Sequence, residues 1–160
     1  MQKMLIVRAT ISFLALPTVV AGIVPALIVR RAMPSYGGLL FGVGLLGVGL
    51  CLLLWCVRDF FVSGKGTLAP WDPPKHLVVV GLYRCVRNPM YLAVLTIIAG
   101  WGLLYASAWM AVYLAFVAVV FHLRVILHEE PWLLRTFHGE WESYRNCVAR
   151  WRPSLHPKFK

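Results

Sequence analysis

Long blocks of apolar residues, separated by short polar stretches, make up most of the chain. The first block runs from Leu5 to Val29, and the second runs from Gly37 to Val57. A helix of 25 residues reaches about 37 Å, enough to cross the roughly 30 Å hydrocarbon core of a bilayer with some tilt. Each block therefore predicts a membrane-spanning helix. Pro17 and Pro25 are expected to kink the first, so that neighbouring helices must satisfy the carbonyls they free.

The third apolar block, Pro89 to Leu127, is too long for one span. As a single helix it would extend about 58 Å, nearly twice the hydrocarbon thickness. Gly100, Gly102 and Ser107 place a turn near its middle, so we predict a tight helical hairpin. The fold class that follows is all-α: a polytopic membrane protein with four transmembrane helices, at 5–29, 37–57, 89–104 and 108–127.

Two polar segments complete a single membrane-embedded domain of 160 residues. Residues 58–88 are predicted to form a loop between the second and third spans, and residues 128–160 form a tail. Aromatic and apolar residues recur in the tail at helical spacing, and Gly139 is its expected break. These features favour a short amphipathic helix at the membrane interface. The residues that recur are Trp132, Leu133, Phe137, Trp141 and Tyr144.

The positive charge of the chain is arranged for membrane orientation. The net charge of +10 could indicate nucleic-acid binding, but the cations flank apolar blocks and form no single stripe. Of the 16 Lys and Arg residues, only Arg30 and Arg31 fall on one side of the predicted membrane, and the other 14 fall on the opposite side. By the positive-inside rule, both termini and the long loop are expected to be cytoplasmic.

Glycine and cysteine patterns indicate helix packing. Residues 42–47 spell G-x-G-x-x-G, but they lie inside an apolar run, without the strand that a dinucleotide site requires. Gly38 and Gly42 instead have the GxxxG spacing that lets helices approach closely in lipid. The four cysteines contain no C-x-x-C pair, and the acids are few and scattered. We therefore expect neither a disulfide framework nor a metal site.

Glu129 and Glu130 are two of only six acids, and they lie where the last span meets the basic tail. They could form ion pairs with one of three arginines: Arg124, Arg135 or Arg87. Alternatively, one carboxylate receives a cationic ligand group while Arg87 or Arg145 receives an anionic one. A zwitterionic, amino acid-like cofactor with an additional positive centre would suit this second interpretation.

Two sequence motifs flank the predicted hairpin. Gly81 to Tyr91 reads G-L-Y-R-C-V-R-N-P-M-Y, and the tail contains E-E-P-W-L at 129–133 followed by Phe137, Gly139 and Tyr144. This pair resembles the two signatures of the isoprenylcysteine carboxyl methyltransferase-like family, which also includes phospholipid N-methyltransferases. The G-T-L-A-P run at 66–70 resembles a loop of its bacterial-type members. Asn88 stands where the eukaryotic enzymes usually carry His.

The resemblance implies a methyltransferase that binds S-adenosylmethionine at the cytoplasmic edge of the membrane, here a bacterial inner membrane. Its candidate catalytic residues are Arg87, Glu130 and Arg145. Glu130 would act as a general base if the acceptor is protonated, and Arg87 or Arg145 would steer a carboxylate acceptor. The residues implied to bind the cofactor are Leu77, Val78, Gly81, Tyr83, Asn88, Pro89, Tyr91, Glu129, Glu130 and Tyr144.

The implied chemistry needs alignment and exclusion of water, with no metal and no nucleophilic side chain. The acceptor is expected to be lipophilic or lipid-linked: the carboxylate of a prenylated cysteine, a headgroup amine, or a small lipophilic thiol or acid. Membrane lipids are the other expected partners. Two alternatives remain, an NADPH-dependent membrane reductase of the sterol type and a non-enzymatic four-helix scaffold. Cofactor binding by the purified protein separates the three.

The charge asymmetry predicts that the loop and the C-terminus face the cytoplasm. In a variant without the natural cysteines, Ser63→Cys and Lys158→Cys should be protected from a membrane-impermeant thiol reagent applied from outside. Labelling of either position in intact cells would overturn the predicted orientation.

Overall fold

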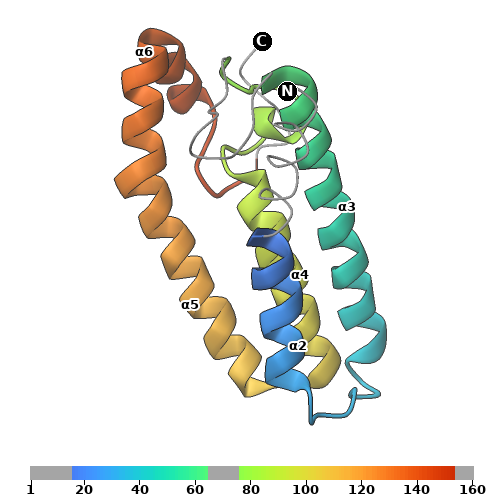
Figure 1. The fold of residues 1–160 in the computed structure, drawn as a ribbon. Coiled ribbons are helices and arrows are strands. Elements are labelled where there is room, and N and C mark those ends of the chain that lie inside the picture. The colour runs from blue at the N-terminus through green and yellow to red at the C-terminus, as the bar shows by residue number, and fades with distance from the viewer. Residues whose placement is uncertain (1–15, 65–75, 154–160) are drawn as a thin grey trace, which may run out of the picture.

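The computed structural model describes residues 16–64 and 76–153, and every regular element in these ranges is a helix (Figure 1). The all-α prediction is confirmed for these residues. The longer helices are α3 (Leu39–Gly64), α4 (Pro89–Tyr105), α5 (Ala108–Arg124) and α6 (Glu130–Cys147). The shorter elements are α2 (Val24–Val29), the 3₁₀-helix η2 (Gly81–Arg84), and the π-helices η1 (Val19–Ile23) and η3 (Val125–Glu129).

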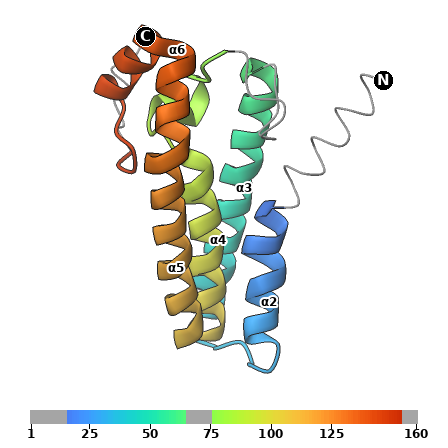
Figure 2. The same cartoon turned by 60° about the vertical axis from the view of Figure 1, so that its left-hand side comes forward.

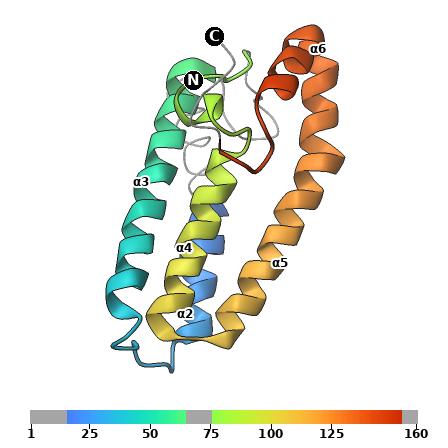
Figure 3. The same cartoon turned by 180° about the vertical axis from the view of Figure 1, so that it is seen from behind.

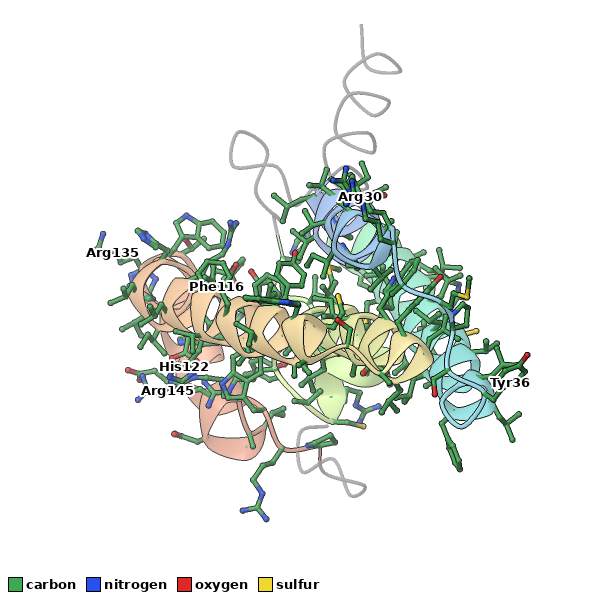
Figure 4. The ribbon with its side chains drawn as sticks, turned by 90° about the horizontal axis from the view of Figure 1, so that it is seen from below. Arg30, Tyr36, Phe116, His122, Arg135 and Arg145 are labelled. Carbon is green, nitrogen blue, oxygen red and sulfur yellow. The ribbon has the colours of Figure 1, made fainter. Side chains whose placement is uncertain are left out.

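The outside of the bundle is apolar. Leu40, Trp109 and Phe116 are between 63% and 80% exposed, and Tyr36 lies at the outer edge beside the start of α3 (Figure 4). Soluble monomers rarely expose so much apolar surface, whereas lipid tails cover it without cost. Within the described residues, two helical stretches are long and apolar enough to cross a membrane: Leu39–Asp59 and Ala108–Cys147. Two shorter apolar helices accompany them, Leu16–Val29 and Pro89–Tyr105.

The helices α4 and α5 begin where the third and fourth spans were predicted to begin, whereas α3 ends later than predicted. The turn between α4 and α5 falls where it was expected, and Ala106 closes it in the left-handed conformation at φ 47°. Helix α3 continues to Gly64, well beyond the predicted end at Val57, because Phe60, Phe61 and Val62 extend its apolar sequence. The loop predicted at 58–88 therefore begins later. Residues 5–15 of the first predicted span lie outside the described residues.

Prolines at two places follow π-helical turns. η1 precedes Val24–Pro25 and η3 precedes Glu130–Pro131. A proline lacks the N–H group, and its ring clashes with the carbonyl four residues before it, so a wider turn admits the ring without ending the helix. As a result the helix that begins at Ala108 continues past Pro131, and it is interrupted only later, at the non-helical backbone of His138. The short helix predicted in the tail is present as α6, which continues from α5 through η3, and the break expected at Gly139 occurs one residue earlier, at His138.

The carbonyls near Pro25 find partners on other helices, as predicted. The indole of Trp101 donates to the carbonyl of Ala21 at 3.0 Å, and the hydroxyl of Tyr113 donates to that of Val20 at 2.9 Å. These bonds hold the η1–α2 segment to α4 and α5. Figure 2 shows α2 running along the same bundle as α4. They satisfy backbone groups that lipid could not.

Helices α3 and α4 pack backbone to backbone at glycines. A Cβ atom at Gly42 would lie 2.7 Å from backbone atoms of Leu104, and one at Gly38 would overlap the carbonyl of Leu103. Gly100 of α4 faces α3 in the same way. The use of the GxxxG spacing for close approach is confirmed.

The two ends of the bundle differ in chemistry. At one end the segment 30–38 meets the α4–α5 turn, where Ser35 donates its N–H to the Leu104 carbonyl at 2.8 Å. At the other end the last turns of α3, the η2 segment and α6 gather (Figures 1 and 3). The second end carries most of the described polar contacts and is where the site lies.

The α3–α4 contact predicts opposite effects for two glycine substitutions. Alanine normally stabilises a helix relative to glycine by up to about 1 kcal/mol. Gly42→Ala should nevertheless lower the thermal midpoint in detergent by several degrees, because its methyl group would force the helices apart. Gly44→Ala is the matched control, since no described atom of another helix lies within 4 Å of its Cβ position; it should leave the midpoint unchanged or raise it. Equal effects of the two would contradict the proposed close contact.

Candidate active site at the polar end of the bundle

A small apolar cluster joins the loop to α6 at the polar end. Trp141, Tyr144 and Val148 are each at most 3% exposed, and Leu77 and Val79 of the loop pack against them. Because these loop residues are apolar, burying them against α6 fixes the loop backbone. The loop is thereby placed beside the second signature motif.

Backbone and side-chain hydrogen bonds then tie the loop to the residues that follow α6. Arg87 donates its backbone N–H to the Ala149 carbonyl at 3.0 Å, and the amide of Asn88 donates to the Arg150 carbonyl at 3.2 Å. The hydroxyl of Tyr144 donates to the Tyr83 carbonyl at 2.6 Å. Residues 149–150 thus lie alongside the first motif, and these hydrogen bonds hold the motif in place.

Glu130 is the centre of the charged cluster. Its carboxylate accepts a bond from Arg87 Nη1 at 2.8 Å and two bonds from Arg150, at 2.7 Å each. The side chains of Arg87 and Glu130 are only 14% and 19% exposed. Charge-assisted bonds of this kind are strong, and a bidentate guanidinium also fixes orientation. Glu130 is therefore held rigidly by two arginines.

The pKa shifts in this cluster have opposing causes. Burial would raise the pKa of the Glu130 carboxyl, but the hydrogen bonds from Arg150 and the charges of Arg87 and Arg150 outweigh it and lower the pKa. Burial, opposed by the charge of Glu130, lowers the pKa of Arg87. An arginine nevertheless stays protonated at neutral pH. The pair is therefore ionised, and Glu130 is a weak base.

Arg87 retains an unused donor. Its guanidinium lies over the ring of Trp141, 5.8 Å from the centroid, and one of its nitrogens bonds to Glu130. Its Nε atom is buried and has no hydrogen-bond acceptor among the residues that the structure describes. A buried donor without a partner costs free energy. An anionic group bound beside it would satisfy this donor.

Glu129 is held by two other residues. One carboxylate oxygen accepts a short hydrogen bond from the hydroxyl of Tyr91 and a bond from Arg124 Nε at 3.0 Å. In an ordinary α-helix, residues 124 and 129 would point in different directions, but the π-helical turn between them brings them to the same side. The ion pairs predicted with Arg124 and Arg87 are thus both present.

Aromatic rings line the neighbouring part of the site. The ring of Tyr91 lies 4.4 Å from that of Phe121 and 6.4 Å from that of Trp151, measured between centroids. The indole of Trp151 donates to His122 Nδ1 at 3.1 Å. The end of α5, the start of α4 and the segment after α6 meet at these rings.

The other residues proposed from the sequence occupy different places. Pro89 is the buried first residue of α4, and Val78 is buried in the loop. Gly81 begins η2 with φ +52°, a conformation that glycine adopts without strain. Arg145 is exposed (Figure 4) and affects Arg87 and Glu130 only through its charge. It is the proposed catalytic residue with the least structural support.

Sequence reasoning missed Arg150 and Trp151. Arg150 was counted only among the cations that set orientation, because no motif marks the segment that follows α6. Their contacts depend on how this segment folds back across the loop. Among the described residues, no group of three or more His, Cys, Asp or Glu side chains could hold a metal ion.

These features describe an all-helical, membrane-type protein with a half-buried Arg–Glu site at one end of its bundle. A sequence model described as phospholipid methyltransferase matches residues 38–140, well over half of the chain. The chain therefore belongs to the phospholipid methyltransferase family. The match includes both Arg87 and Glu130, whereas Tyr144, Arg145 and Arg150 lie beyond it. Searches of curated proteins and of solved structures found no match.

The geometry predicts unequal costs for breaking the cluster. Glu130→Gln removes the charged partner of the largely buried Arg87 and of the partly exposed Arg150, whereas Arg87→Ala leaves Glu130 paired with Arg150. Loss of a part-buried charged hydrogen bond costs about 2–3 kcal/mol. Thermal unfolding in detergent should show a larger decrease for Glu130→Gln than for Arg87→Ala. Arg152→Ala is the control, because this arginine is exposed; equal midpoints for all three variants would refute the cluster's structural role.

Proposed function

We propose that this protein transfers a methyl group from S-adenosylmethionine to a lipophilic acceptor at the cytoplasmic face of the membrane. The observation that carries the proposal is the direct contact between the two signature motifs, Arg87 with Glu130, in a chain of the phospholipid methyltransferase family. A scaffold without activity has no need of such a half-buried charged site.

The described residues fit the charged end of this cofactor. A carboxylate needs a donor, and the buried Nε of Arg87 has no acceptor among the described residues. An amino group and a sulfonium need negative charge. Glu129 supplies it, since the structure shows bonds to only one of its carboxylate oxygens and its side chain is 33% exposed. When bound, the cofactor supplies an electrophilic methyl group.

The roles of the site residues follow from their partners. Arg87 binds the anionic group, and Glu130 positions Arg87. Glu130 is a poor candidate for the general base, because two guanidiniums occupy its carboxylate and lower its pKa. Glu129 and Tyr91 face the cationic groups. Leu77, Val78, Gly81, Tyr83, Asn88, Pro89 and Tyr144 form the surrounding wall, and Arg145 contributes charge at the rim.

The acceptor is proposed to enter from the bilayer. α5 diverges from α4 toward the polar end, and the rings of Tyr91 and Phe121 bridge the two helices there (Figures 1 and 3). The exposed surface of α5 is apolar, so an acyl chain can approach along it. Each buried CH₂ group contributes about 0.8 kcal/mol to such binding. The polar cofactor enters instead from the basic, aqueous side.

Cofactor binding tests the proposal against a reductase that uses NADPH. Calorimetry on the purified protein should detect S-adenosylmethionine and no NADPH. Arg87→Ala should weaken this binding at least about tenfold, as expected for loss of one charge-assisted hydrogen bond, whereas Arg152→Ala should not. Binding of NADPH alone would favour the reductase, and binding of neither would favour the scaffold.

Methyl transfer tests the acceptor class. With labelled cofactor and native membranes, label should accumulate in the lipid phase or on lipid-modified molecules, and the Arg87→Ala protein should transfer little. Label found only in water-soluble molecules would refute a lipophilic acceptor while leaving the cofactor assignment intact.

A further inference from the structure

The segment that follows α6 is attached to α5 by a hydrogen bond between two aromatic side chains. The indole of Trp151 donates to Nδ1 of His122 at 3.1 Å, and the two rings lie 6.1 Å apart, measured between centroids. Among the residues that the structure describes, Trp151 is the one hydrogen-bond partner of this imidazole. The bond joins residues 29 positions apart in the chain, and the proposed function does not use it.

The chemistry of the two rings fixes the protonation state of His122. An indole nitrogen can only donate a hydrogen bond, so Nδ1 must carry a lone pair in order to accept it. A neutral imidazole then has its proton on Nε2, whereas an imidazolium has protons on both nitrogens and cannot accept. The bond between Trp151 and His122 therefore exists only while His122 is neutral.

Residues next to this bond support both carboxylates of the site. Arg150, which precedes Trp151, makes two hydrogen bonds to Glu130. The ring of Trp151 lies 6.4 Å from that of Tyr91, whose hydroxyl bonds to Glu129. In Figures 1 and 3 the segment that carries Arg150 and Trp151 passes between α6 and the start of α4. Release of Trp151 from α5 therefore loosens the support of both carboxylates.

Imidazoles are the groups around this bond that change charge near neutral pH. The surrounding elements are α4, α5, η3 and the segment after α6, and their ionisable side chains here are Tyr91, Arg124, His128, Glu129, Arg150 and Arg152. Tyrosine, arginine and glutamate side chains ordinarily keep one charge state between about pH 6 and pH 8, whereas an imidazole changes its own. His122 and Arg152 are both exposed. His128, the other imidazole of this group, provides a matched control.

We propose that His122 is a positioning residue and that its bond to Trp151 is a pH-sensitive latch. At higher pH, neutral His122 holds Trp151 and so maintains the support of Glu129 and Glu130. At lower pH, the imidazolium releases the indole, and the site binds its ligand less tightly. The latch stands on the hydrogen bond alone, whereas its effect on the cofactor rests on the proposed function.

The indole N–H group reports the state of the latch directly. In protein labelled with ¹⁵N-tryptophan, each of the seven tryptophans gives one indole cross-peak, and the peak missing from Trp151→Phe belongs to Trp151. Between about pH 8 and pH 5.5, the range in which imidazoles titrate, this peak should move in the wild-type protein and exchange faster with water. His122→Gln should abolish the pH response, because an amide oxygen accepts a bond without titrating. His128→Gln, the control, should retain it.

Cofactor affinity tests the positioning role. Calorimetry with S-adenosylmethionine at the same two pH values gives one ratio for each variant, and comparing these ratios cancels the titration of the cofactor itself. The loss of affinity at low pH should be about fivefold greater for the wild-type protein than for His122→Gln, the value of one neutral hydrogen bond. Trp151→Phe lacks the indole N–H but keeps an aromatic ring, so it should behave like His122→Gln. His128→Gln should behave like the wild-type protein.

The two measurements have separate outcomes. A Trp151 peak that does not respond to pH in the wild-type protein would overturn the latch, and so would an equal response in His122→Gln. Equal pH dependence of cofactor binding in the wild-type protein, His122→Gln and Trp151→Phe would overturn the positioning role. Absence of cofactor binding at both pH values would count against the proposed function, and the indole titration would still decide the latch.

Discussion

The pairing of Glu130 with Arg87 and Arg150 is the interaction on which the polar end of this protein depends. It joins the loop before α4, the arm formed by α5 and α6, and the segment that follows the arm. Charges that are partly removed from water attract one another strongly, but each is costly if left unpaired. The three segments are therefore stable chiefly in each other's presence, and the pairing fixes the position of the Arg87 guanidinium.

A π-helical turn in the backbone places Glu130 where it can bind the two arginines. Pro131 would interrupt an ordinary helix, yet η3 lets the arm continue and rotates Glu129 toward Arg124 and Tyr91. Such single π-turns occur frequently at functional sites. The π-helical turn thus makes the carboxylates of Glu129 and Glu130 point in different directions. Glu130 binds Arg87 and Arg150, while Glu129 binds Arg124 and Tyr91.

Away from the polar end, the helices of the bundle are adapted to lipid. Glycines bring α3 and α4 together, and large apolar side chains cover the outside. In lipid there is no hydrophobic force between helices, so close packing and satisfied backbone groups must hold them. The bonds from Trp101 and Tyr113 to the carbonyls of Ala21 and Val20 show the same requirement at the kink of the first helix.

The sequence alone determined the helical class, the hairpin turn, the close contact at Gly38 and Gly42, and the family, because these depend on apolar length, local turn residues and short motifs. It also singled out Arg87 and Glu130 as candidates, but it left open whether they meet. Tertiary structure decided that, and it added Arg150 and Trp151. These contacts join residues far apart in the chain, and no periodicity or motif spacing encodes how the segment after α6 folds back over the loop.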